Sequence, residues 1–389
     1  MELTENAVPT RQATGKPVTS KIAYIDHLKV LLITLVVLHH AFITYGAPGS
    51  WYYQQKTTLI PALFPMTVFV ATNQSFFMGF FFFISALFVA PSFRKKGVAR
   101  FLADRFKRLG IPLVFYSLIL SPVLNYIVEH YGYGRHHSII EYMSGYHHWI
   151  DFGVLWFVAA LLIFNLAYVV FKSIPAINFN LKVSWPSNRQ ILIAGLVLGL
   201  LSFFTRLVFP TGWVLSPLGF QLGYFPQYIA LFILGIVASN NNWLEQLNLK
   251  QGRYLRILAV FMVTVILPVM FIFYLVLKFP GSDFNGGWHT IAFSYSLWEQ
   301  IAGVAIMGAM LCIAKFKWNN PTAFMKKLSD NAFGVYIFHP LVLITLSLLV
   351  KSWTVDPVVK LIIVAPLAVV LSFVFSSFIR KIPLVSDII

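Results

Sequence analysis

The chain has 389 residues, of which 58% are hydrophobic and only 11% are charged. Soluble domains carry about 25% charged residues and keep a polar exterior, so this composition excludes a water-soluble enzyme. The formal net charge of +16 does not indicate a nucleic-acid partner, because the basic residues lie between apolar stretches, where they orient helices. A single cysteine, Cys312, excludes an intramolecular disulfide and any metal site built from several cysteines.

The apolar segments predict ten transmembrane helices. A hydrocarbon core about 30 Å thick needs roughly 20 mostly apolar residues per helix. The expected spans are 28–46, 68–90, 109–128, 152–172, 190–208, 221–239, 255–278, 292–314, 331–351 and 358–379. The sequence therefore predicts an all-α polytopic membrane protein, in which residues 1–20 form a disordered cytoplasmic tail and 21–389 form a single transmembrane domain.

Lysine and arginine gather in alternate connections between these spans. The clusters are Arg11, Lys16 and Lys21; Arg94, Lys95, Lys96, Arg100, Arg105, Lys107 and Arg108; Lys172, Lys182 and Arg189; Lys250, Arg253 and Arg256; Lys315, Lys317, Lys326 and Lys327; and Arg380 and Lys381. With ten spans, every cluster falls on one side of the membrane. Because basic loops stay in the cytoplasm, we expect both termini there, in a multi-pass protein of a cell membrane.

The first span carries ionisable residues that a lipid-facing helix would avoid. Asp26 and Lys29 lie at its cytoplasmic mouth, and His39 and His40 interrupt its apolar run. Lys29 and His40 are eleven residues apart, so they share one helix face, with His40 about 16 Å deeper. This predicts a passage from Lys29 to a catalytic His40. His39 points about 100° away, and either a structural hydrogen bond or a substrate contact would explain it.

Four other polar positions are candidates for the site. Arg105 and Arg108, three residues apart, either anchor the third span or form a clamp for phosphate. Glu299 and Arg206 lie toward the outer ends of their spans, where they either contact a polar acceptor or extend outward to water. The outer segment 129–151 holds five histidines, but adjacent histidines rarely chelate one ion, so we expect no metal site.

Five motifs in chain order carry a resemblance to a known family. They are Asp26, Lys29 and His40; Phe81-Phe82-Phe83-Ile84-Ser85-Ala86; Arg105-Phe106-Lys107-Arg108; Trp156-Phe157; and Tyr336-Ile337-Phe338-His339. At these residues the chain resembles the membrane-bound acyltransferase-3 family, and within it the branch similar to glucan biosynthesis protein C, which transfers succinyl groups to periplasmic glucans. The resemblance extends over about 21–381. Ala86 departs from the family, which has glycine there, and the doubled histidine leaves spacing alone to choose His40.

The resemblance implies an enzyme that transfers an acetyl or succinyl group from cytoplasmic acyl-CoA, a co-substrate and not a bound cofactor, to a hydroxyl of an extracytoplasmic carbohydrate such as a periplasmic glucan. It implies His40, His339, Tyr336 and Ser85 as catalytic candidates, Lys29, Arg105 and Arg108 as the CoA site, and Glu299, Arg206 and His39 as substrate contacts. The acyl group, the acceptor and the oligomeric state, a homodimer included, stay open. The alternatives are a transporter or flippase of a glycolipid or small anion and a non-catalytic scaffold.

Overall fold

The computed structural model describes residues 22–174 and 182–389, and within these ranges it is built from helices without a β-strand. The helices are α1 (Ala23–Tyr45), α2 (Ile60–Gln74), α3 (Phe77–Ala86), α4 (Val89–Arg105), α5 (Ile111–Phe115), α6 (Ser121–Ile127), α7 (Ile139–Ser144), α8 (Trp156–Lys172), α9 (Asn188–Val208), α10 (Phe225–Asn240), α11 (Trp243–Gln246), α12 (Leu249–Phe261), α13 (Leu267–Val276), α14 (Thr290–Lys317), α15 (Ala323–Leu349), α16 (Pro357–Ile379) and α17 (Pro383–Ser386). Shorter π-helical turns are η1 (Phe106–Gly110), η2 (Tyr116–Leu120), η3 (Val128–Gly132) and η6 (Met262–Ile266), and 3-10 turns are η4 (Gly153–Leu155), η5 (Leu222–Tyr224) and η7 (Gly281–Phe284). The expected tail, 1–20, lies outside the described residues.

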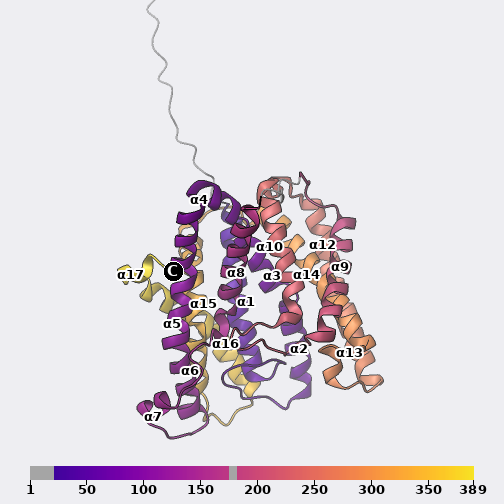
Figure 1. Ribbon diagram of the computed structural model, residues 1–389. Helices are drawn as coiled ribbons and strands as arrows, with labels where there is room; N and C mark the ends of the chain where they lie inside the picture. Colours follow the sequence, from indigo (N-terminus) through magenta and orange to yellow (C-terminus); the bar gives the residue numbers. More distant parts are fainter. Residues whose placement is uncertain (1–21, 175–181) are drawn as a thin grey trace, which may run out of the picture.

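Ten continuous helical segments are long and apolar enough to cross a membrane, which confirms the predicted all-α polytopic fold. They cover Ala23–Tyr45, Ile60–Ala86, Val89–Gly132, Gly153–Lys172, Asn188–Val208, Leu222–Asn240, Leu249–Val276, Thr290–Lys317, Ala323–Leu349 and Pro357–Ile379. In Figure 1 α1, α3, α8 and α10 form the middle of the bundle, with α15 and α16 toward one side and α9 and α12 toward the other.

The basic segment 91–108, expected as a connection, is helical instead, and it joins the third span without a loop. Gly97 interrupts this helix with φ +69°, a conformation that glycine adopts without steric cost. Figure 1 shows α4 at the end of the bundle where α1 begins. The C-terminal segment lies beside the bundle on the half nearer this end (Figure 1), with Lys107 Nζ 4.0 Å from Asp387 Oδ2. We call this end of the bundle the basic face.

Three prolines in the spans each follow a π-helical turn by two residues. Pro112, Pro122 and Pro268 come after η1, η2 and η6. A proline lacks the N–H of the ordinary helical bond, and its ring clashes with the carbonyl four residues earlier. In each case that carbonyl lies within the π-helical turn, which is wider than an α-helical turn and so accommodates the ring.

Glycines allow the closest helix contacts. Gly195 and Gly199 of α9 form a G-x-x-x-G pair against α14, where a Cβ added to Gly199 would lie 2.9 Å from Leu297 Cα. Close backbone approach through small residues is a common way for membrane helices to associate. Gly235 of α10 similarly lies against Ala86 of α3, where a Cβ would be 2.6 Å from the alanine methyl. The missing side chain at Gly235 thus makes the room that Ala86 needs.

The second span is broken between α2 and α3. Phe76 leaves the helical conformation with φ −137° and ψ −34°. Gln227 Nε2 donates to the Ser75 carbonyl oxygen over 2.7 Å, so a polar side chain from α10 binds a carbonyl at the break. Inside a membrane such a group needs an internal partner, and irregular backbone occurs there only when it is enclosed by protein.

Candidate active site

Two histidines predicted from the sequence face one another inside the bundle. His40 of α1 and His339 of α15 have ring centroids 5.3 Å apart and ring planes 17° apart. His339 is fully buried, whereas His40 is partly exposed. His40 lies five residues before the end of α1, about 8 Å along the axis, and is therefore nearer the face opposite to the basic face.

The hydrogen bonds of His339 define which of its nitrogens is free. Its Nδ1 lies 2.9 Å from the carbonyl oxygen of Tyr336, which only accepts, so Nδ1 must carry the proton. In the neutral ring Nε2 then holds an unshared electron pair. Nε2 of His339 and Nδ1 of His40 are both buried without a hydrogen-bond partner in the part of the chain that the structure describes. Unpaired polar atoms in such a setting mark a binding or reaction site.

The hydroxyl of Tyr336 is already engaged. It donates to the carbonyl oxygen of Val154 in η4, at the start of the fourth span. Tyr336 therefore supports His339 through its backbone carbonyl, while its side chain holds the neighbouring span. The predicted polarising role of the Tyr336 hydroxyl would require this bond to break.

A tryptophan that the sequence did not predict completes the site. Trp51, from the connection after α1, stacks on His40 with ring centroids 4.0 Å apart and lies 6.0 Å from His339. Its indole Nε1–H, a donor only, is also buried without a partner among the described residues. Two free ring nitrogens and one free donor thus meet in one place.

Two tyrosines continue the site toward the opposite face. The hydroxyls of Tyr52 and Tyr116 lie 2.8 Å apart, directly beside Gly153. Burial raises the pKa of Tyr52, and the nearby Asp151 carboxylate raises it further, so this phenol stays protonated at neutral pH. Nothing in the spacing of these residues indicated the contact, because it joins segments 64 positions apart.

His39 lies in a different environment from His40. Its ring packs on Phe77 with centroids 4.9 Å apart, and its Nδ1 lies 3.3 Å from Nδ2 of Asn73, which also donates to the Leu35 carbonyl oxygen. His39 is only 5% exposed. The structure thus gives it a hydrogen bond near the break between α2 and α3 and does not direct it to His339.

On the basic face, Arg105 and Arg108, three residues apart, share a partner. Asp104 lies 3.5 Å from Arg105 and 3.4 Å from Arg108, and Lys96 approaches the same carboxylate at 2.9 Å. Three cations around one carboxylate leave two net positive charges. Arg105 also donates to Ser92, and its Nε is buried without a partner among the described residues.

Lys29 makes a contact separate from this cluster. Its ammonium is 3.2 Å from Asp26 and 5.4 Å from the ring centre of Phe88, just before α4. Asp26 accepts from Ser329 of α15 over 2.9 Å, which ties the beginnings of α1 and α15 together.

The passage expected along α1 is not open in this structure. Ile33 and Val36 lie between Lys29 and His40 on the same helix face, and each is 1% exposed. Partly exposed side chains instead follow one side of α3, at Phe81 and Ser85, and end near Lys29. Ser85 therefore lies on this partly exposed side of α3.

Glu299 and Arg206 do not extend outward to water. Each is 1% exposed, and Arg206 Nη2 lies 2.5 Å from Glu299 Oε2. Arg206 also donates to Ser296 Oγ, and Gln300 donates to the same glutamate oxygen. The two predicted acceptor contacts are thus a buried ion pair that joins α9 to α14, with Glu299 Oε1 left unpaired among the described residues.

Ten apolar spans around a facing pair of imidazoles define a multi-pass membrane protein with a polar centre inside the membrane. The acyltransferase-3 family model, described as an acyltransferase domain, matches residues 22–377, and the chain belongs to this family. The membrane acyltransferase class expected from the motifs is thereby confirmed. Searches of curated proteins and of solved structures each gave no significant match. Within the described ranges no three His, Cys, Asp or Glu side chains are grouped to hold a metal ion.

Proposed function

We propose that this membrane acyltransferase uses acyl-CoA as its donor and an extracytoplasmic carbohydrate hydroxyl as its acceptor. The basic face is then the cytoplasmic face, in accordance with the positive-inside rule, and both termini lie there. The observation that carries the proposal is the facing pair of His40 and His339, each with an unpartnered nitrogen, in a chain of acyltransferase family.

The imidazole pair supplies the groups that the reaction needs. The acceptor oxygen attacks the thioester carbonyl carbon, a C–O bond forms and the C–S bond breaks. His40 takes the hydroxyl proton, which ends on the departing sulfur and gives free CoA. The indole N–H of Trp51 stabilises the negative charge that develops on the carbonyl oxygen. In a second route a ring nitrogen of His40 attacks the thioester carbonyl carbon, the C–S bond breaks, and CoA leaves with the imidazole proton. The acceptor hydroxyl then attacks the acyl-imidazole, the C–N bond breaks, and the hydroxyl proton returns to His40.

The cationic cluster supports CoA as the donor. Lys96, Arg105 and Arg108 surround a single carboxylate, and guanidinium groups bind phosphate through paired hydrogen bonds. The adenosine phosphates would bind here, close to Lys29, and the pantetheine arm would extend inward past Ser85 toward His40. The rise of about 16 Å between Lys29 and His40 is of the length of such an arm.

The chain's resemblance to the glucan biosynthesis protein C-like branch supports an acetyl or succinyl donor and a glucan or another cell-envelope polysaccharide as the acceptor. A bacterial inner membrane gives access to both substrates, since CoA thioesters are cytoplasmic and these carbohydrates lie outside.

Release of free CoA tests the proposal. The purified protein in lipid nanodiscs is supplied with acetyl-CoA or succinyl-CoA, and the thiol is measured. We expect wild-type protein to release CoA and His40→Ala to do so at least about 100-fold more slowly, because it lacks the base or the acyl carrier. His136→Ala, at an exposed histidine outside the spans, is the matched control and should retain the wild-type rate. A folded His40→Ala protein with wild-type turnover contradicts the assignment, and a wild-type protein without CoA release favours transport.

A further inference from the structure

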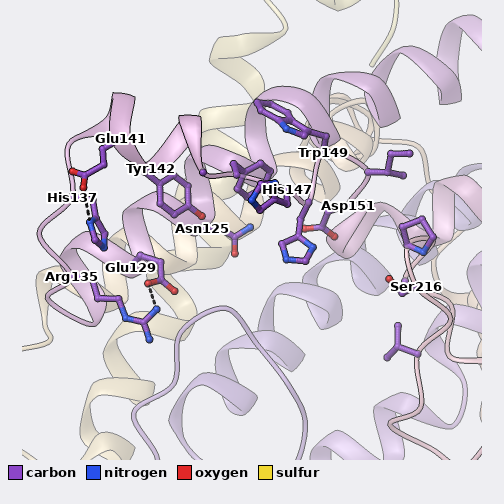
Figure 2. Close-up of a pocket in the computed structure, with 17 residues that line it drawn as sticks. Asn125, Glu129, Arg135, His137, Glu141, Tyr142, His147, Trp149, Asp151 and Ser216 are labelled. Carbon is purple, nitrogen blue, oxygen red and sulfur yellow. Dashed lines mark hydrogen bonds and ion pairs between the residues drawn. The ribbon is translucent and has the colours of Figure 1, made fainter.

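A pocket of about 1040 Å³ opens on the face opposite to the basic face. One wall is formed by the segment from the end of α6 through α7 to Asp151, and the other by the connection 214–219 before η5. Figure 2 shows Asn125, Tyr142, Trp149 and Asp151 on one side and Ser216 on the other. Its volume slightly exceeds the range of about 300–1,000 Å³ typical of small-ligand sites, and is large enough for an oligomeric ligand.

Aromatic rings and hydroxyl groups line this pocket together. Tyr146 lies 5.8 Å from Tyr142 and 5.2 Å from Trp149, measured between ring centroids. Trp149 is 41% exposed, so its ring is accessible to a ligand in the pocket. Burial and the neighbouring Tyr146 and Glu129 raise the pKa of Tyr142 to about 12, so its phenol stays a hydrogen-bond donor at neutral pH. Flat apolar faces next to polar groups match a sugar ring, which has C–H faces and hydroxyl edges.

The charges of the pocket disfavour an anionic ligand. Its carboxylates are Glu129, Glu141 and Asp151, whereas Arg135 is its one guanidinium. Arg135 is already paired with Glu129 over 2.5 Å. Three negative charges against one positive charge leave a net charge of two negative with neutral histidines. Carboxylates accept hydrogen bonds from sugar hydroxyls, so the lining fits a neutral carbohydrate.

Contacts connect this pocket to the imidazole pair. Asp151 accepts from Ser121 over 2.5 Å and from the backbone N–H of Gly153 over 2.9 Å. Gly153 lies directly against the hydroxyls of Tyr52 and Tyr116. Tyr52 follows Trp51 in the chain, and Trp51 stacks on His40. A short line of polar and aromatic groups therefore leads from the pocket wall to the reacting histidine.

We propose that this pocket binds the acceptor as a neutral carbohydrate chain and presents one of its hydroxyls toward His40. The inference rests on the proposed function and replaces Glu299 and Arg206, which pair with one another, as the acceptor contacts. Trp149, Tyr142 and the carboxylates of the pocket are its specificity-determining residues.

Calorimetric titration of the full chain in nanodiscs tests the binding step. The probes are laminariheptaose, a neutral glucan oligosaccharide, and an oligogalacturonate of equal length, which is anionic. We expect laminariheptaose to bind more tightly, and Trp149→Ala to weaken its binding about tenfold, as loss of a stacked aromatic anchor does. Trp149→Phe should restore most of the affinity. Trp288→Ala removes an equally large ring that is 78% exposed outside the pocket, and should leave binding unchanged.

Absence of laminariheptaose binding, tighter binding of the anionic probe, or equal affinity of Trp149→Ala and Trp288→Ala proteins would each overturn the inference. Kinetics separate it from the proposed function. Trp149→Ala should raise the KM for the oligosaccharide about tenfold, whereas Trp288→Ala, outside the pocket, should leave both this KM and the acceptor-independent release of CoA by water unchanged. A wild-type protein that binds the glucan without ever releasing CoA would refute the transferase proposal and leave the carbohydrate pocket standing.

Discussion

The hydrogen bond from His339 Nδ1 to the Tyr336 carbonyl oxygen fixes the free nitrogen of the imidazole that faces His40. A backbone carbonyl is present whatever the side chain, so this hydrogen bond does not depend on the residue type at position 336. The Tyr336 side chain has a separate task, because its hydroxyl donates to Val154. The carbonyl of Tyr336 therefore affects the reactivity of His339, whereas its hydroxyl affects the stability of the protein.

Tyr336→Phe separates these two tasks. The carbonyl that accepts from His339 remains, so we expect kcat within about threefold of the wild type. The Val154 carbonyl loses its donor, which lowers the free energy of unfolding by about 1–3 kcal/mol. Thermal unfolding in detergent and CoA release check the two expectations. A loss of kcat above 100-fold in a stable protein would show that the hydroxyl acts in the reaction.

Sequence spacing identified residues whose signal is local. Tyr336 and His339 are three residues apart, and the structure brings His339 to the predicted His40. Trp51 escaped prediction because its contact with His40 depends on how the connection after α1 folds back into the bundle. Arg206 and Glu299 were expected to contact the acceptor or to extend outward to water, but they pair with one another across 93 positions of the chain, and the periodicity of a sequence cannot reveal such a contact.

At the scale of elements, the Arg206–Glu299 pair and the glycines of α9 act on the same helix contact. Gly195 and Gly199 bring the backbone of α9 close to α14, and the ion pair joins the C-terminal end of α9 to the N-terminal half of α14. A buried ion pair that loses one partner leaves an uncompensated charge, whereas apolar replacement of both partners removes the desolvation cost as well.

Glu299→Gln should therefore destabilise the protein by about 3–5 kcal/mol, because Arg206 stays charged and buried. The double variant Arg206→Met with Glu299→Leu should recover most of that loss, as measured by thermal unfolding in detergent. If the double variant is as unstable as the single one, the pair is not the source of the effect. If the recovered double variant lacks acceptor-dependent turnover, these residues contact the acceptor after all.

Among the helices and breaks of the structure, those determined by hydropathy could be predicted from the sequence. All ten spans were predictable because each needs a long apolar run. The helix over the basic segment 91–108 was not, since charged residues form helices as readily as loops and only Gly97 marks its bend. The break at Phe76 was hidden too, because the side chain that stabilises it, Gln227, belongs to α10.

Over the whole molecule, the imidazole pair lies asymmetrically in the membrane. His40 is about 26 Å from the beginning of α1 and about 8 Å from its end. The cations lie on the face farther from the imidazole pair, and the proposed carbohydrate pocket lies on the nearer face. This arrangement suits a long, thin donor and a bulky acceptor. The account therefore requires the acyl group to cross most of the bilayer while it is still attached to CoA.

The most direct measurement uses proteoliposomes in which all molecules have the same orientation. Acyl-CoA with a radioactive acyl group is supplied on one side and a neutral glucan oligosaccharide on the other. We predict that label enters the oligosaccharide only when acyl-CoA is on the basic face and the oligosaccharide is on the opposite face. Transfer with both substrates on one face, or with the two exchanged, would contradict the account.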